Sequence, residues 1–234
     1  MIGIIGAMDE EVAKIKEKME DTEITTIAAM DFCEGTIHGY PVVVVRSGIG
    51  KVNAAMCAQI LAVKYKVDAI INTGIAGSLD ASIDIGDIVL STDTLEHDMD
   101  AVAFGYPVGQ IPRMDTLSFA ADDKLRALAK EICQKVNPDI SVFEGRVVSG
   151  DQFVSDKDKK EWLVSTFKGS CTEMEGAAIG HAAYLNKIPF LIIRAISDKA
   201  DDSAFIDYPT FEAKAIEHSV RLLLGLCDKM SQNN

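Results

Sequence analysis

The sequence has few cysteines and histidines, and neither type is arranged to form disulfides or to hold a metal. The cysteines lie far apart with no CxxC pair, and their odd number indicates reduced thiols in a cytosol rather than a disulfide framework. The histidines show no HExxH or other paired spacing, so the sequence predicts no metal site. The residues concerned are Cys33, Cys57, Cys133, Cys171 and Cys227, and His38, His97, His181 and His218.

Positive charge is also scarce. Lysine and arginine together number 23 against 36 acidic residues, which gives a formal net charge of −13. This balance argues against a nucleic-acid or anionic-membrane partner and favours a neutral or cationic substrate. The chain opens with a strand-like run, "MIGIIGAM", with no basic leader and no apolar run long enough to cross a bilayer. We therefore expect a soluble, cytoplasmic protein.

No linker, internal repeat or low-complexity segment interrupts the chain. Its 234 residues, 48% of them hydrophobic, can bury a full core, and we expect one domain over residues 1–234. Apolar runs typical of strands alternate with helical patterns, which predicts an α/β fold with a mixed, largely parallel central sheet flanked by helices. Strands are expected at 2–7, 34–48 (including a hairpin), 67–78, 86–95, 142–151 and 188–198, and helices at 9–20, 51–65, 120–136, 174–186 and 211–230.

One long irregular segment, residues 97–118, remains outside this pattern. It carries Phe104, Tyr106, Pro107 and Pro112, which makes it more apolar than a plain solvent loop. Such a segment is often functional or packed on a partner subunit.

Arg194 is the strongest anomaly in the sequence. It lies inside an apolar strand, where an unpaired guanidinium would cost several kcal/mol. We therefore expect a buried carboxylate partner, and the candidates are Glu11, Glu173 and Glu175. A purely structural ion pair is as consistent with the sequence as a functional one.

Carboxylates also stand where predicted strands and helices meet, and ligands gather beyond the carboxyl ends of parallel strands. Glu173 and Glu175 open the helix predicted from "CTEMEGAAIGHA"; they either favour the helix dipole or face a ligand. Asp198 follows a buried strand and either caps the next turn or acts as a general acid whose pKa burial raises. His181 is interpreted as a packing residue. The glycine loops "SGIGK" and "TGIAGS" match no phosphate-binding fingerprint.

Together these strand ends resemble a known family. "GIIGAMDEEV", "SGIGKVNAA", "NTGIAGS", "VSGDQFV", "EMEGAAIGH" and "IRAISDKAD" follow one another as they do in the 5′-methylthioadenosine/S-adenosylhomocysteine nucleosidases of the purine nucleoside phosphorylase superfamily. The resemblance runs from the first residue to about Phe211, and the pairing of "EMEGAA" with "RAISDKAD" is its most specific part.

The resemblance implies hydrolysis of the N-glycosidic bond of 5′-methylthioadenosine and S-adenosylhomocysteine, with 5′-deoxyadenosine as a further candidate substrate. Adenine and a 5-thio-substituted ribose would be released, in methionine salvage and without a cofactor. Asp198 would donate a proton to N7 of adenine, and Glu11 would activate the attacking water. Glu175 would bind the ribose hydroxyls, which makes Glu173 its structural neighbour, and Arg194 would keep these carboxylates charged and oriented.

The resemblance also implies how the substrate is held. Phe153 would stack on adenine, the backbone of Val154 would read its edge, and Ser197 would support the acid beside it. The family forms homodimers in which a loop of the neighbouring subunit closes the 5′ pocket. The implied binding residues are Met8, Ile49, Ala76, Gly77, Phe153, Val154, Met174, Ser197, Phe205 and Tyr208, with Ala101, Phe104 and Pro112 supplied by the partner subunit.

Three residues depart from the family's pattern. Ile75 stands where a small hydroxyl residue is found in close relatives, at a position whose contact is mainly through the backbone. Tyr208 stands where phenylalanine is frequent, so its hydroxyl would alter the 5′ pocket. Lys199 stands where an apolar residue is frequent; it either faces solvent or lowers the pKa of the neighbouring Asp198.

Alternative functions are a phosphorylase of the same superfamily and a nucleoside-binding protein without catalysis. A phosphorylase needs basic residues beside the first strand to bind phosphate, and the acidic "AMDEEV" there argues against it. A binding protein has no need to keep Glu11, Glu175, Arg194 and Asp198 together. A regulator without nucleoside chemistry is disfavoured by the acidic charge. Methylthio, homocysteinyl, 5′-deoxy and futalosine-type groups all stay open as the 5′ substituent.

Overall fold

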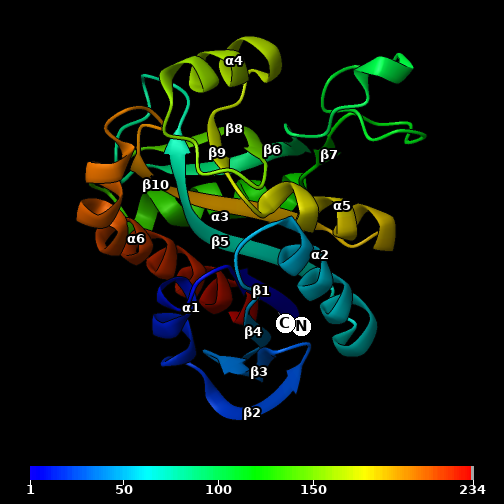
Figure 1. Ribbon diagram of the computed structural model, residues 1–234. Coiled ribbons are helices and arrows are strands. Elements are labelled where there is room, and N and C mark those ends of the chain that lie inside the picture. Colours follow the sequence, from blue (N-terminus) through cyan, green and yellow to red (C-terminus); the bar gives the residue numbers. More distant parts are fainter. Residues whose placement is uncertain (233–234) are drawn as a thin grey trace.

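A ten-stranded mixed sheet runs through the computed structural model, which describes residues 1–232 (Figure 1). The strands are β1 (Ile2–Gly6), β2 (Glu20–Ile27), β3 (Met30–Ile37), β4 (Tyr40–Arg46), β5 (Ala69–Ser78), β6 (Ile88–Glu96), β7 (Phe119–Ala120), β8 (Val142–Ser149), β9 (Cys171–Glu173) and β10 (Phe190–Asp198). The fully buried β1 lies parallel between β4 and β5. β10 pairs with both β5 and β6, so β5, β9, β8, β6 and β10 close into a ring of strands.

Helices cover both sides of this sheet. They are α1 (Asp9–Lys16), α2 (Lys51–Ile60) with the π-helical turn η1 (Leu61–Tyr65), the short 3₁₀ helix η2 (Val102–Phe104), α3 (Asp123–Val136), α4 (Lys157–Phe167), α5 (Gly176–Asn186) and α6 (Ala204–Gln232). On one side α6 contacts α1 and α3, and on the other α2 packs against α5 (Figure 1). Within residues 1–232 no helix combines the length and the apolar character that a bilayer span requires.

Polar side chains fix where two of the helices begin. The Asp122 carboxylate accepts a hydrogen bond from the backbone N–H of Leu125 at 2.8 Å, and Asp156 accepts one from Lys159 at 2.8 Å. Each bond satisfies a backbone donor that has no partner inside the helix, so α3 begins directly after Asp122 and α4 directly after Asp156.

The predicted α/β fold and mixed sheet are confirmed, but several element boundaries differ. The first helix ends at Lys16 rather than continuing to residue 20, and residues 20–27 form the edge strand β2, which is mostly exposed and so carries no apolar alternation. The helix α4 was not predicted. The helix expected from residue 174 begins at Gly176, because the short strand β9 precedes it, and the last helix begins at Ala204 rather than Phe211.

The irregular segment 97–118 is confirmed as well. It contains only the single turn of η2 and extends away from the body of the protein, at the upper right of Figure 1. β1, β5 and β10 are parallel, so their carboxyl ends lie together at one edge of the sheet. The short strand β9 lies beside this edge, where its Thr172 pairs with Gly77 of β5. This edge holds the functional site.

Candidate active site

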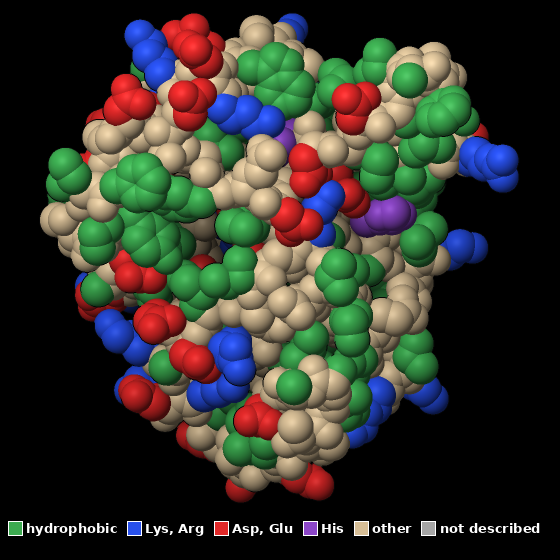
Figure 2. Space-filling view, in the orientation of Figure 1, with side chains coloured by type: hydrophobic (Ala, Val, Ile, Leu, Met, Phe, Trp, Pro, Cys, Tyr) green, Lys and Arg blue, Asp and Glu red, His purple; other side chains and the backbone are tan. Residues whose placement is uncertain are grey.

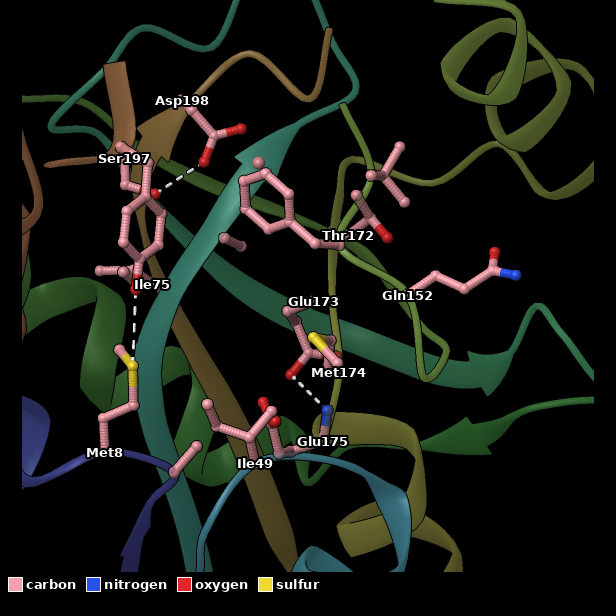
Figure 3. A pocket seen from close by; sticks show the side chains of 16 residues that line it. Met8, Ile49, Ile75, Gln152, Thr172, Glu173, Met174, Glu175, Ser197 and Asp198 are labelled. Atoms are coloured by element: carbon pink, nitrogen blue, oxygen red, sulfur yellow. Dashed lines mark hydrogen bonds between the residues drawn. The ribbon is translucent and has the colours of Figure 1, made fainter. Parts of the chain in front are cut away.

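A cavity of about 440 Å³ opens at the carboxyl ends of these strands. It appears in Figure 2 as a hollow left of centre, with hydrophobic side chains gathered beside it. Figure 3 shows Ser197 and Asp198 at one end of the cavity and Met8, Ile49 and Glu175 at the other. The lining residues are Ala7, Met8, Ile49, Ile75, Ala76, Gly77, Gln152, Phe153, Val154, Thr172, Glu173, Met174, Glu175, Ser197, Asp198 and Tyr208.

Asp198 is the last residue of β10 and is only 2% exposed. Its carboxylate accepts hydrogen bonds from Ser197 Oγ at 2.9 Å and from the backbone N–H of Ala200 at 2.8 Å. A β-carbon on Gly77 would lie 2.7 Å from Asp198 Oδ1, so glycine at this position leaves room for the acid. Burial raises the pKa of Asp198 even though these two hydrogen bonds lower it. The side chain is therefore suited to hold a proton at higher pH than an ordinary aspartate.

Arg194, 1% exposed, lies on β10 below the cavity and is surrounded by polar groups. Its Nε and Nη2 both donate to Glu173 Oε2, and Nη2 also donates to Asn72 Oδ1. Glu175 Oε2 lies 4.0 Å from Nη2. The expectation of a buried carboxylate partner is confirmed, and the direct partner is Glu173.

Glu175 stands immediately before α5 and points toward the turn that precedes α2. Its Oε1 accepts a hydrogen bond from the backbone N–H of Gly50 at 2.8 Å. Burial and the nearby Glu173 raise the pKa of Glu175 to about 7, against the opposing effects of Arg194 and the Gly50 N–H. The carboxyl group thus changes charge within the physiological range.

Glu11 lies in the first turn of α1 and does not line the cavity. Its carboxylate accepts hydrogen bonds from the backbone N–H groups of three lining residues, Ala7 at 2.6 Å, Met8 at 3.0 Å and Ile75 at 3.1 Å. Burial raises the pKa of Glu11, although Arg194 and these donors lower it. The carboxylate therefore lies directly behind the part of the cavity wall that Ala7, Met8 and Ile75 form.

The remaining walls are mostly apolar. The Phe153 ring meets the Tyr208 ring edge-on, with centroids 5.8 Å apart, and the Phe205 ring with centroids 5.6 Å apart. The Tyr208 hydroxyl lies 3.1 Å from Glu212 Oε1 and 3.4 Å from Met8 Sδ, and it has one proton to donate to either acceptor. Val154 and Met174 complete the predicted lining, whereas Phe205 contacts Phe153 without lining the cavity itself.

The three residues expected to act from a partner subunit lie in the projecting segment. Ala101, Phe104 and Pro112 do not line the cavity of their own chain. Phe104 is 84% exposed, so its ring projects from the surface. An exposed ring on a projecting segment is typical of a contact with another molecule.

Five lining residues were not identified from the sequence as site residues: Ala7, Ile75, Gln152, Thr172 and Glu173. Gln152 could have been found, because it directly precedes Phe153 in the quoted "VSGDQFV". Thr172 gave no signal, because β9 is three residues long and its place beside β5 is a tertiary feature. Glu173 was interpreted as structural, and it both lines the cavity and binds Arg194.

Two other polar residues have local partners of their own. The His181 ring stacks on Phe119 with centroids 4.7 Å apart, as expected for a packing residue. Lys199 Nζ donates to the carbonyl of Ile83 at 2.6 Å and lies 3.2 Å from Asp84, so the ammonium is bound away from the neighbouring Asp198 carboxylate. Within the described residues, no group of three or more His, Cys, Asp and Glu side chains is placed to hold a metal ion.

Comparison with known proteins extends over nearly the whole chain. The model of the phosphorylase superfamily matches residues 1–227. A 5′-methylthioadenosine/S-adenosylhomocysteine nucleosidase of Bacillus cereus is 39% identical over 230 residues, which cover 98% of this chain and 99% of the relative.

Solved structures show the same relationship. The nucleosidase of Colwellia psychrerythraea in complex with adenine superimposes with a TM-score of 0.92 at 39% identity, covering 97% of this chain and 93% of that one. A futalosine hydrolase of Helicobacter pylori also gives a TM-score of 0.92, at 35% identity and 97% coverage of both chains. The chain belongs to the 5′-methylthioadenosine/S-adenosylhomocysteine nucleosidase family of the phosphorylase superfamily.

Proposed function

We propose that this protein hydrolyses the N-glycosidic bond of 5′-methylthioadenosine and S-adenosylhomocysteine. The observation that carries the proposal is the cavity, which has the buried Asp198 at one end and Glu175 at the other (Figure 3). Outside the cavity lining, Arg194 binds Glu173 and lies 4.0 Å from Glu175 Oε2. The family to which the chain belongs and the adenine bound to a relative of 39% identity support a purine nucleoside as the ligand.

Asp198 is assigned the general acid. When the glycosidic bond breaks, its electron pair goes to adenine, which leaves poorly as an anion and needs a proton at N7. Burial raises the pKa of Asp198, which favours the protonated carboxyl that this step requires. Ser197 and Ala200 hold the carboxyl oriented through the hydrogen bonds described above.

The carboxylates at the other end are assigned to the sugar and the water. The ribosyl group becomes positively charged as adenine leaves, and ionised Glu175 would bind its hydroxyls and stabilise that charge. Glu11 would accept a proton from the attacking water, whose oxygen then bonds to C1′. A carboxylate with a raised pKa is a stronger base than an exposed one. Arg194 would orient this cluster by binding Glu173 directly.

Phosphorolysis is disfavoured by the charge of the site. None of the residues that line the cavity, within the described part of the chain, is a lysine or an arginine. Arg46 lies nearby, in a groove that shares Met8 and Ile49 with the cavity, but its Nε lies 3.2 Å from a carboxylate oxygen of Asp9. A phosphate dianion would therefore meet carboxylates without a free cation to hold it.

The apolar wall beside Glu175 is assigned to the 5′ substituent. Met8, Ile49 and Tyr208 line it, with Phe205 at its margin, and an alkylthio group would fit these surfaces. We further propose that the protein is a cytoplasmic homodimer in which the partner subunit's Ala101, Phe104 and Pro112 close this side of the cavity. The exposure of Phe104 supports that arrangement.

Adenine release tests the proposal. Purified protein is incubated with 5′-methylthioadenosine, S-adenosylhomocysteine or a futalosine-type nucleoside, each with and without phosphate. We expect release from the first two substrates at a rate that phosphate does not change. Strict dependence on phosphate would show a phosphorylase, and release of base from the futalosine-type nucleoside alone would move the substrate to that class.

A further inference from the structure

Lys51, the first residue of α2, links several segments around the cavity, and none of the assigned catalytic roles uses it. Its Nζ donates hydrogen bonds to Glu96 Oε2 at 2.9 Å and Asp98 Oδ1 at 2.6 Å. Its backbone N–H donates to Asp151 Oδ1 at 2.8 Å, and the backbone N–H of Asp151 donates to Asp98 Oδ2 at 3.0 Å. These bonds form a closed ring that includes both the side chain and the backbone of Lys51.

The same turn makes the hydrogen bond to Glu175. Gly50 directly precedes Lys51, and its backbone N–H is the donor to Glu175 Oε1. Gly48 and Gly50 have φ values of 86° and 94°, which side chains other than glycine rarely adopt. Other bonds also hold this turn: the Gly48 N–H donates to the Ala7 carbonyl at 3.1 Å, and the Asn53 side chain donates to the Ile49 carbonyl at 2.6 Å. Because Lys51 directly follows Gly50, the ring around Lys51 is a further constraint on the direction of the Gly50 N–H.

The ring also reaches the substrate-binding walls. Ile49, on one side of it, and Gln152 and Phe153, on the other, line the cavity. Asp98 is the second residue of the projecting segment 97–118, which is proposed to meet a partner subunit. A change at Lys51 would therefore alter two walls of the cavity without any contact between its side chain and the substrate.

Charged groups lie around both Glu175 and Lys51. Besides Gly50, Glu175 faces Glu173 from β9, Arg194 from β10 and Glu11 from α1. Around Lys51, His181 of α5 lies 3.4 Å from Glu96. Burial lowers the pKa of Lys51, but its hydrogen bonds to Asp98 and Glu96 outweigh that effect and raise it, so Lys51 is charged across the working pH range.

We propose that Lys51 is a positioning residue for Glu175, which it affects by holding the Gly50 N–H against the carboxylate. The inference rests on the proposed function, in which ionised Glu175 binds the ribose hydroxyls. The N–H bond favours the ionised carboxylate. Without Lys51 the turn would relax, Glu175 would lose a donor, and its ionisation would require a higher pH.

The test compares Lys51→Met with Arg126→Met as a matched control. Arg126 also bridges two carboxylates, Asp123 and Glu144, and its side chain is 17% exposed against 18% for Lys51, but it lies on α3 away from the cavity. For Lys51→Met we expect kcat/KM for 5′-methylthioadenosine to fall about tenfold to a hundredfold, as for a lost hydrogen bond to a charged group. The acid limb of its pH profile, where kcat/KM falls as Glu175 takes up a proton, should move to higher pH. Lys51→Arg should restore part of the lost kcat/KM and part of the shift.

Three results would overturn the inference. One is a folded Lys51→Met variant with the wild-type kcat/KM and an unshifted acid limb. Another is an equal loss in Arg126→Met, which would show only a general effect of removing ion pairs. If Lys51→Met does not fold, Asp98→Asn keeps the shape of the ring and should shift the limb in the same direction; no shift would be the third.

A wild-type protein that releases no adenine would contradict the proposed function separately. The crystal structure of Lys51→Met then decides the positioning claim without any assay. A longer Gly50–Glu175 separation supports the claim, and a hydrogen bond kept at the 2.8 Å of the wild type overturns it.

Discussion

Replacing Arg194 by methionine should shift the pH dependence of the enzyme. The substitution keeps most of the side-chain volume but removes the cation from among Glu173, Glu175 and Glu11. Arg194 Nη2 lies 4.0 Å from Glu175 Oε2. At an effective dielectric constant of about 20, charges at that separation interact by about 4 kcal/mol. This corresponds to about 3 pKa units.

The pKa of Glu175 should therefore rise from about 7 toward about 10 when the guanidinium is removed. The shift is an upper limit, because Glu173 and Glu11 would also take up protons and repel Glu175 less. Since the ionised form is assigned to the ribose, loss of ionisation alone would lower kcat/KM at neutral pH by up to several hundredfold.

The assay is kcat/KM for 5′-methylthioadenosine as a function of pH, with circular dichroism to show that each variant is folded. The control is necessary because breaking a buried ion pair costs about 3–5 kcal/mol of stability. Arg194→Lys keeps the charge and should move the acid limb much less. A folded Arg194→Met variant whose acid limb stays at the wild-type pH would refute the electrostatic role of Arg194.

Three further outcomes are expected. Asp198→Asn should lower kcat by about 10²–10⁴-fold in steady-state kinetics, while calorimetry still detects binding of 5′-methylthioadenosine; an unchanged kcat would remove Asp198 as the acid. Phe153→Ala should weaken adenine binding by about 1–3 kcal/mol in the same calorimetric titration if the ring stacks on the base. Burial lowers the pKa of His97 from 6.5 to about 4. Between these pH values the unfolded chain binds more protons than the folded one. The free energy of unfolding therefore falls by about 3 kcal/mol as the pH decreases from 6.5 to about 4. Urea unfolding at the two ends of this pH interval should show a smaller loss of stability in His97→Gln than in the wild type. An equal loss in the two proteins would contradict this expectation.

The strands of the core could be predicted because their apolar runs are continuous. β5 and β10, for example, are buried at every residue, so no partner had to be known to identify them. β2 could not, because an edge strand exposed to solvent has no apolar face to distinguish it from the end of a polar helix. The start of α5 was misplaced by two residues, since β9 gains its structure only by pairing with β5 and β8.

For the site, the sequence predicted that Arg194 needs a carboxylate but not which one. Glu11, Glu173 and Glu175 were equal candidates, and only the tertiary arrangement brings Glu173 into direct contact. The link from Lys51 to Asp98 and Asp151 joins residues up to 100 positions apart, which no local pattern reveals. The roles of the individual carboxylates remain predictions for the experiments described above.

We expect water, rather than phosphate, to attack C1′ of the nucleoside. The most direct test is turnover of 5′-methylthioadenosine in oxygen-18-labelled water with ordinary phosphate present, followed by mass spectrometry of the sugar product. Hydrolysis predicts a free 5-methylthioribose that carries the heavy oxygen at C1. A sugar phosphate without the heavy isotope would contradict this expectation.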